Sequence, residues 1–142
     1  MSVGAGYVFD KTYTIDNATG VVQFVAVVAG AEDGGCALPA AANAAKFLGF
    51  TQTAQTRQNK AVSVRRLGVS AAVANGPINF GDRLVIASAA GDVKSVEAII
   101  AAGLETPATE WNVVGRAENT TANTGDTVYV FVLPETVPLA VS

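Results

Sequence analysis

The stretch LPAAANAAKFLGFTQTAQTRQNKAVSVRRLGVSAAVANGPINFGDRLVIAS, residues 38–88, contains most of the pattern that decides the fold. It begins with an alanine-rich segment, continues through a polar stretch, and then alternates short valine-rich runs with turns that contain glycine. Valine suits a pleated surface, whereas glycine and asparagine suit tight turns. This order predicts a mainly β protein, a small barrel or sandwich, with one short α-helix.

The alanine-rich segment, residues 38–46, is the predicted helix. Pro39 suits a first helical turn, and alanine is the best helix former. Leu38 and Ala42 fall close to one helical face, and Gly49 follows the segment as a glycine at a helix C-terminus does. We therefore expect a helix of about two to three turns.

Short strands are expected on both sides of this segment. The predicted strands are residues 21–29, 61–67, 69–74, 83–88, 111–116 and 127–133. In the last of these, TVYVFVL, both alternating faces are apolar, which places the strand centrally, and Pro134 ends it. For residues 93–100 a helix and a strand both fit the pattern.

The length predicts a single domain over residues 1–142. Residues 1–19 form either an N-terminal arm or an edge strand, and residues 135–142 form a tail. No apolar run reaches the roughly 18 residues of a membrane span. The N-terminus also lacks the basic region of a secretory signal. We therefore expect a soluble protein that has no membrane partner and is not exported by that route.

Two segments share a layout at an offset of 66 residues. Phe47-Leu-Gly49 matches Val113-Val-Gly115, a polar ten-residue loop follows each, and the alternating runs 61–64 and 127–130 come next. Chance similarity between β segments and an internal repeat both account for this pattern. A true repeat predicts that the two polar loops emerge at one end of the molecule and form a contact surface.

Charge is divided unevenly along the chain. Residues 1–71 carry six basic and four acidic groups, or +2, and residues 72–142 carry three basic and eight acidic groups, or −5. Either this is an ordinary solvated surface, or it provides complementary surfaces between copies or with a partner. The net charge of −3 gives no indication of nucleic-acid binding.

No acidic residue occurs between Gly34 and Gly81, so the basic side chains there are the predicted interface residues: Arg57, Lys60, Arg65 and Arg66. Arg65 and Arg66 point to opposite faces of their strand. The one that faces the core needs a partner, within the chain or across an interface.

The residue types weigh against catalysis. The chain has no histidine, which is the commonest general base and metal ligand, and its single cysteine, Cys36, excludes an intrachain disulfide. We expect Cys36 to be buried or merely tolerated, since no neighbouring residue would lower its pKa. The pairs Lys60–Ser63 and Lys94–Ser95 lack a supporting motif for Ser–Lys chemistry. The prediction is a protein without catalytic residues, cofactor or metal.

Short motifs spread over about residues 20–133 resemble the bacteriophage capsid decoration, or cement, proteins. The motifs are residues 38–45 before 47–50, 62–69, 78–82 before 84–85, 91–93, and 113–117 before 128–133. The resemblance implies a tulip-like barrel or sandwich with a short helix. It also implies a homotrimer, made in the host cytoplasm, that sits on the outer surface of the virion and bridges copies of the major capsid protein.

Two other functions remain open at this point. A receptor- or carbohydrate-binding β module of a phage particle would present an exposed aromatic cluster, which an aromatic content of 7% disfavours. We expect Trp111 to pack in the core or at a strand edge instead. A small Ser–Lys enzyme is the third candidate.

Overall fold

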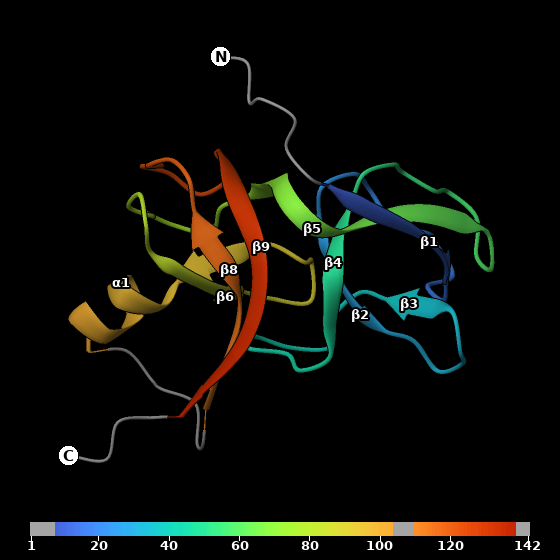
Figure 1. Cartoon of the computed structure of the whole chain (residues 1–142), viewed down its shortest axis with the longest axis horizontal. Helices are drawn as coiled ribbons and strands as arrows, with labels where there is room; N and C mark the ends of the chain where they lie inside the picture. The colour runs from blue at the N-terminus through green and yellow to red at the C-terminus, as the bar shows by residue number, and fades with distance from the viewer. Residues whose placement is uncertain (1–7, 104–109, 139–142) are drawn as a thin grey trace.

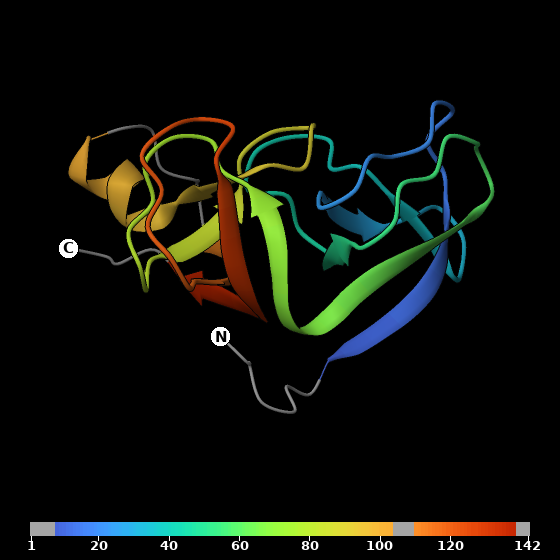
Figure 2. The same cartoon turned by 90° about the horizontal axis from the view of Figure 1, so that it is seen from above.

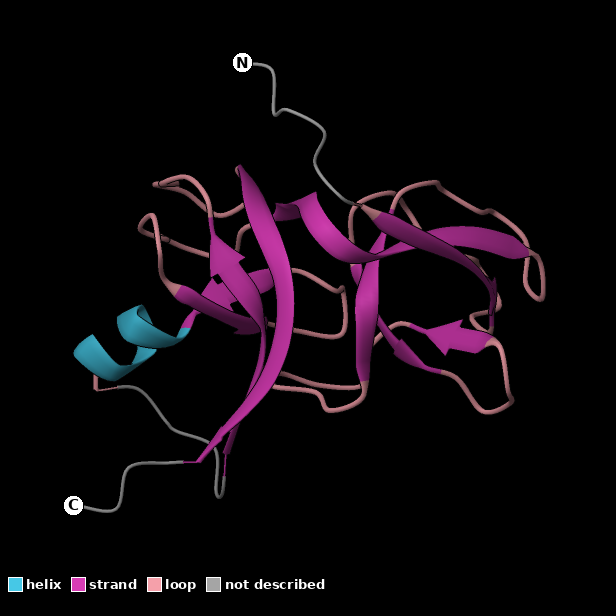
Figure 3. Ribbon diagram, viewed as in Figure 1, coloured by secondary structure: helices cyan, strands magenta, loops and turns pink. Residues whose placement is uncertain are grey.

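The computed structural model describes residues 8–103 and 110–138, which form nine strands and one short helix (Figures 1 and 3). The strands are β1 (Phe9–Ile15), β2 (Ala26–Ala29), β3 (Gly35–Ala37), β4 (Phe47–Thr51), β5 (Ala61–Val73), β6 (Arg83–Ile86), β7 (Val93–Ser95), β8 (Glu110–Ala117) and β9 (Thr127–Pro138). The helix is α1 (Val96–Ala101). The predicted mainly β class is confirmed.

The strands pair in the order β1-β3-β2-β4-β5-β9-β8-β6-β7. An additional pairing between β1 and β5 closes the first five of these strands into a barrel. The expected barrel with a single short helix is therefore confirmed for the described residues. We call residues 8–67 the first half and residues 68–138, as far as they are described, the second half.

Strand β5 belongs to both halves. Its first part pairs with β1 and β4, and its last six residues, from Gly68 to Val73, pair with β9. The strand bends sharply between the two parts (Figure 2). Gly68 has φ 101°, a value that glycine adopts without steric cost. The sequence predicted two strands here, 61–67 and 69–74, whereas a glycine at the bend keeps them continuous.

The two halves repeat the same strand pairing in the same register. The offset is 57 residues for β2 and β3 against β6 and β7, 66 for β4 and the first part of β5 against β8 and β9, and 59 for β1 against the last part of β5. Matching pairs are Val27–Gly49 and Leu84–Gly115, Ala29–Cys36 and Ile86–Val93, Tyr13–Val62 and Ala72–Val128, and Phe50–Arg65 and Arg116–Phe131. The repeat suggested by the 66-residue offset is real.

A close backbone approach explains why glycine recurs at positions 49 and 115. A Cβ atom at Gly49 would lie 2.1 Å from the carbonyl oxygen of Arg65, and one at Gly115 would lie 2.1 Å from that of Phe131. Both glycines also lie beside a register shift in the neighbouring pairing. The two halves therefore need the same residue for the same steric reason.

The expected meeting of the two polar loops is wrong. Figures 1 and 2 place the loop of residues 52–60 and the loop of residues 118–126 toward opposite ends of the long axis. The halves follow one another along this axis, so equivalent loops are separated by the length of a half. They do not form one contact surface.

The predicted helix over residues 38–46 is also wrong. Asn43 and Lys46 have φ values of 55° and 61°, which an α-helix does not contain. The N–H of Asn43 donates to the carbonyl of Ile86 (2.8 Å), so contact with the second half overrides the helix propensity of alanine. The helix forms instead at the counterpart of this segment, offset by 57 residues.

Residues 93–100, for which helix and strand both fitted, contain both. Strand β7 ends at Ser95, whose hydroxyl accepts a hydrogen bond from the N–H of Ala98 (3.0 Å) and so caps α1. The same hydroxyl donates to Asp82 (2.7 Å). Val96 and Ile99 are the buried face of this helix.

Both terminal predictions need correction. Residues 9–15 form β1, a member of the closed barrel, and so are neither a free arm nor an edge strand. β9 continues past Pro134 to Pro138, because Pro134 lies at the register shift opposite Val114, where the ladder requires no N–H donor. The predicted tail therefore does not begin at residue 135; residues 1–7 and 139–142 lie outside the described part.

The predicted strand over residues 21–29 is shorter than expected. Only β2, its last four residues, is a strand, because Phe24 has φ 64° and breaks the extended backbone. Val21 still forms an isolated antiparallel bridge with Gln55. Its counterpart in the second half is the bridge between Ile78 and Thr121.

The main core cluster joins the halves. It contains Ala26 and Phe50 from the first half together with side chains from the second half. A second cluster fills the first barrel and includes Cys36. A third lies under α1 and includes Trp111, which confirms the expectation that this tryptophan is a core residue.

Candidate functional site

The outer face of β9 is apolar and open to solvent. Tyr129, Phe131 and Leu133 are 49%, 39% and 49% exposed, whereas the valines that alternate with them are fully buried. β9 lies between β5 and β8, so its predicted central position is confirmed. Its outer face, however, has no cover within the described residues.

Neighbouring strands extend this apolar surface. Val69 pairs with Phe131 in the β5–β9 ladder, and Phe9 pairs with Leu67 in the β1–β5 ladder. Phe9 and Leu67 are 53% and 45% exposed. We call the set the β5–β9 face: Phe9, Leu67, Val69, Tyr129, Phe131 and Leu133. Contiguous exposed apolar side chains of this kind mark interaction sites.

An ion pair flanks the face on each side. Arg116, directly opposite Phe131 in the β8–β9 ladder, lies 3.6 Å from the carboxylate of Glu135. On the other side Arg65 contacts Asp10 (2.8 Å). Each flank therefore carries one positive and one negative group.

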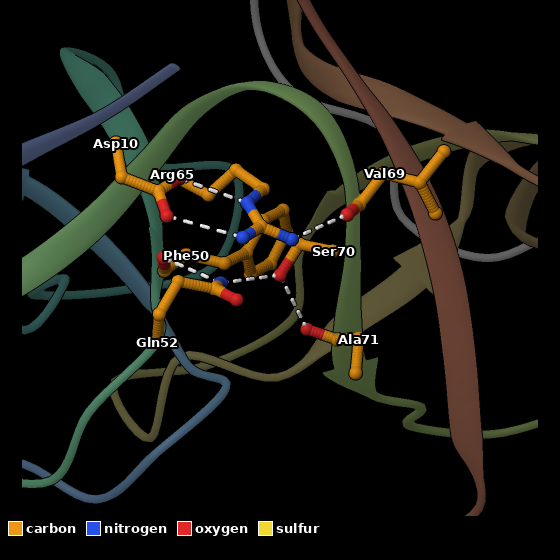
Figure 4. Close-up of polar contacts among 7 residues, drawn as sticks. All are labelled: Asp10, Phe50, Gln52, Arg65, Val69, Ser70 and Ala71. Carbon is orange, nitrogen blue, oxygen red and sulfur yellow. Dashed lines mark hydrogen bonds and ion pairs between the residues drawn. The ribbon is translucent and has the colours of Figure 1, made fainter. Parts of the chain in front are cut away.

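Arg65 holds the bend of β5 (Figure 4). Its Nε and Nη2 donate to the two carboxylate oxygens of Asp10 (2.8 and 3.1 Å), and its Nη1 donates to the carbonyl of Val69 on the far side of the bend (3.0 Å). The hydrogen bond to Asp10 raises the pKa of Arg65 above its ordinary value. This guanidinium is thus engaged within the chain.

Gln52 and Ser70 make a second connection at the bend (Figure 4). Gln52 Nε2 donates to the carbonyl of Phe50 (3.1 Å) and to Ser70 Oγ (2.8 Å). The hydroxyl of Ser70 donates in turn to the carbonyl of Ala71 (2.9 Å). These bonds tie β4 to the second part of β5 and so fix the orientation of one half against the other.

The four predicted interface residues fall into two pairs. Arg57 and Lys60 are exposed in the loop of residues 52–60. Arg65 is bonded to Asp10, and Arg66 donates to the hydroxyl of Tyr13 (2.7 Å). The structure does not bring the four together at one site, and their interface role stays a prediction.

The search for basic residues missed the β5–β9 face. The signal was present in TVYVFVL, where large apolar residues occupy both alternating positions. That pattern indicates either a strand covered on both faces or a strand with one face left for a partner. Sequence periodicity does not separate these two cases.

The candidate nucleophiles have structural roles. Ser95 caps α1 and is bonded to Asp82, and the N–H of Ser63 donates to Thr53 Oγ1 (3.1 Å). Cys36 is fully buried, and desolvation, with a smaller contribution from Asp16, raises its pKa to about 11. The prediction of a buried rather than reactive cysteine is confirmed.

The described residues offer few other sites. A solvent-open cavity of about 350 Å³ is lined by Lys46, Phe47, Asn112, Val113, Pro134, Glu135 and Thr136. Among residues 8–103 and 110–138, no group of three histidine, cysteine or acidic side chains is placed to hold a metal ion. No helix in the same ranges is long and apolar enough to cross a bilayer.

Comparison with known proteins gives a likeness in fold. No family model and no curated protein matches the sequence. Among solved structures, the chain is similar to the N base of the head fiber protein gp8.5 of bacteriophage phi29. The TM-score is 0.56 with 16% sequence identity, over 89% of this chain and 95% of that chain. The shared fold therefore extends over both halves.

Proposed function

We propose that this protein is a non-enzymatic structural component of a bacteriophage virion that binds the outer surface of the head. The observation that carries the proposal is the fold likeness to a head fiber base over nearly the whole of both chains. The sequence motifs that resemble capsid decoration proteins support the same location. The principal open feature of the described chain is an apolar sheet face, which suits a protein partner rather than a reaction.

The finer proposal is that the protein binds as a homo-oligomer, a trimer, and reinforces contacts between major capsid proteins. Joining several weak contacts in one rigid oligomer raises the effective concentration of each. A modest contact per subunit then gives stable attachment. No cofactor, nucleic acid or membrane is part of this proposal.

The exposed loop of residues 52–60 is the capsid-binding segment in this scheme. Its Arg57 and Lys60 are exposed and basic, and they lie in a part of the chain without acidic residues. They would pair with acidic groups of the major capsid protein. Arg65 and Arg66 are engaged within the chain and support the same half.

Co-sedimentation with undecorated expanded capsids tests the proposal. We expect the wild-type protein to sediment with capsids, and the binding to weaken as salt rises. The double variant R57A/K60A should bind at least about tenfold more weakly, because each lost contact is multiplied over the oligomer. Lys94→Ala, which removes a lysine from β7, is the matched control and should bind normally. Absence of wild-type binding would refute the proposal.

A second function is favoured by one specific observation. Tyr129 and Phe131 are exposed on one face, as a receptor- or carbohydrate-binding module would require. A glycan array tests this alternative directly. Specific binding that is lost in Tyr129→Ser would establish it, and an array without hits would reject carbohydrate as the ligand.

A further inference from the structure

We infer that the β5–β9 face is the surface through which one copy of this chain binds a second copy, head to tail. The inference deepens the proposed function, on which it rests only for the expectation of an oligomer. The partner is committed: a second copy of the chain, contacting this face with its first half.

The internal repeat provides a control for the apolar character of the face. The first-half counterparts of Val69, Tyr129 and Phe131 are Asp10, Ser63 and Arg65. The same positions in the same fold are thus polar in one half and apolar in the other. The fold does not require large apolar side chains there, so their exposure in the second half indicates a partner.

The first half also shows what kind of surface covers this place. Phe50, directly opposite Arg65, is fully buried and packs in the core cluster with side chains of the second half. Its counterpart, opposite Phe131, is Arg116, whose side chain is 50% exposed. In the first half this part of the sheet is covered by the next barrel-like half. In the second half no further half follows.

Helix α1 covers only part of the corresponding surface in the second half. It packs over Val85 and Val113, the counterparts of Val28 and Phe47, which contact the main core in the first half. α1 lies at the far left in Figure 1, away from β9 at the centre. The helix therefore caps one side of the repeat and leaves the β9 side open for another copy.

The charges favour a head-to-tail contact over a symmetric one. A symmetric contact would bring together two second halves, in a region of the chain whose net charge is −5. A head-to-tail contact places this region against one of net charge +2. The ion pairs on the two flanks supply both signs for contacts at the rim. Head-to-tail contacts continue until they close a ring, which agrees with the proposed trimer.

The repeat also supplies the test variant. V69D/F131R places on the β5–β9 ladder the same pair that Asp10 and Arg65 form at the equivalent register. We expect the wild-type protein in solution to have more than twice the monomer mass of 14.4 kDa, measured by light scattering after size exclusion. The double variant should have the monomer mass and keep the wild-type melting temperature.

Ile100→Arg is the matched control, because Ile100 is 52% exposed on α1, outside the face. Its mass should equal that of the wild type. Should V69D/F131R fail to fold, Phe131→Ser removes the central ring without adding charge, and a shift of the oligomer toward monomer on dilution is then the expected result.

Three results would overturn the inference. These are a wild-type monomer at every concentration, a wild-type dimer, and a double variant that keeps the wild-type mass. If the wild type is monomeric and the double variant loses capsid binding, the face binds capsid protein instead. A wild-type oligomer that does not sediment with capsids would refute the proposed function and leave this inference standing.

Discussion

The two halves of this molecule share a strand plan and differ in what covers it. The first half is closed by the ladder between β1 and β5, and part of its outer surface is buried by the second half. The second half is joined at the equivalent place by one parallel bridge, Ala74 to Val93, and it carries α1 and an open apolar face. The repeated positions show what the fold needs, and the differing positions show where this chain has acquired something else.

The largest effect is expected at the two glycines that the halves share. Gly49→Ala and Gly115→Ala each place a Cβ atom against a backbone carbonyl, which no side-chain movement relieves. Each should lower the free energy of unfolding by about 3 kcal/mol or more, measured by urea denaturation. Similar losses at both positions would confirm that the halves are sterically equivalent.

Gly34→Ala is the control for these variants. A Cβ atom at Gly34 would have no neighbour within 4 Å, so only its φ of 77° is unfavourable. We expect a loss of about 1 kcal/mol. A loss at Gly49 or Gly115 no greater than this would contradict the close-contact explanation.

The next effect concerns Cys36, whose counterpart is the buried Val93. Because the pKa of Cys36 is raised to about 11 from an ordinary value of 9.0, the folded state holds this proton more tightly than the unfolded state. The resulting stability is complete below about pH 9 and is lost as the pH rises toward 11. The loss should be about 2–3 kcal/mol.

Cys36→Val isolates this term. At neutral pH the variant should differ from wild type by less than about 1.5 kcal/mol, since the second half already has valine at this position. The difference between the two proteins should change in favour of the variant between pH 9 and 11, measured by denaturation at each pH. Parallel pH profiles would show that Cys36 does not titrate with folding.

The smallest effect is expected at Asn43, where the halves diverge. Its Nδ2 donates to the carbonyl of Glu110 (2.9 Å), and its Oδ1 accepts from the N–H of Asn112 (2.7 Å). Asn43→Ala removes these bonds between the halves and places alanine at a positive φ, at a total cost of about 2 kcal/mol. Asn43→Gly keeps the backbone freedom and should cost about 1 kcal/mol. Equal costs for both variants would contradict a role for the backbone angle.

Sequence patterns predicted most of the strands because alternation and turn residues are local properties. Gly49 and Gly115, with the polar loops after them, also indicated the repeat, because its strongest signal is a short pattern that recurs at one fixed offset. The helix was misplaced because alanine-rich residues 38–46 are held by Ile86 and Asn112, contacts that lie far away in the sequence. Val96, Ile99 and Ile100 had the helical spacing, but the segment is short and the first part of its run is a strand.

The candidate site was less accessible to sequence reasoning. Charge counting selected Arg65 and Arg66, yet each has a hydrogen-bond partner within the first half. The exposed side chains of β9 resembled a fully buried strand, because apolar residues look alike whether a core or a partner covers them. Comparing the two halves position by position separates these cases, and that comparison requires the strand registers.

The continuity of β5 has a consequence for how this molecule opens. A strand that completes one half and begins the other cannot leave either ladder without loosening both, so neither half has a separate unfolding transition. Amide hydrogens of residues 61–64 and 69–73 should therefore exchange with similar protection, close to that of global unfolding. Most pairings also join residues distant in sequence, so this shared strand ties folding to slow, long-range closure of the chain.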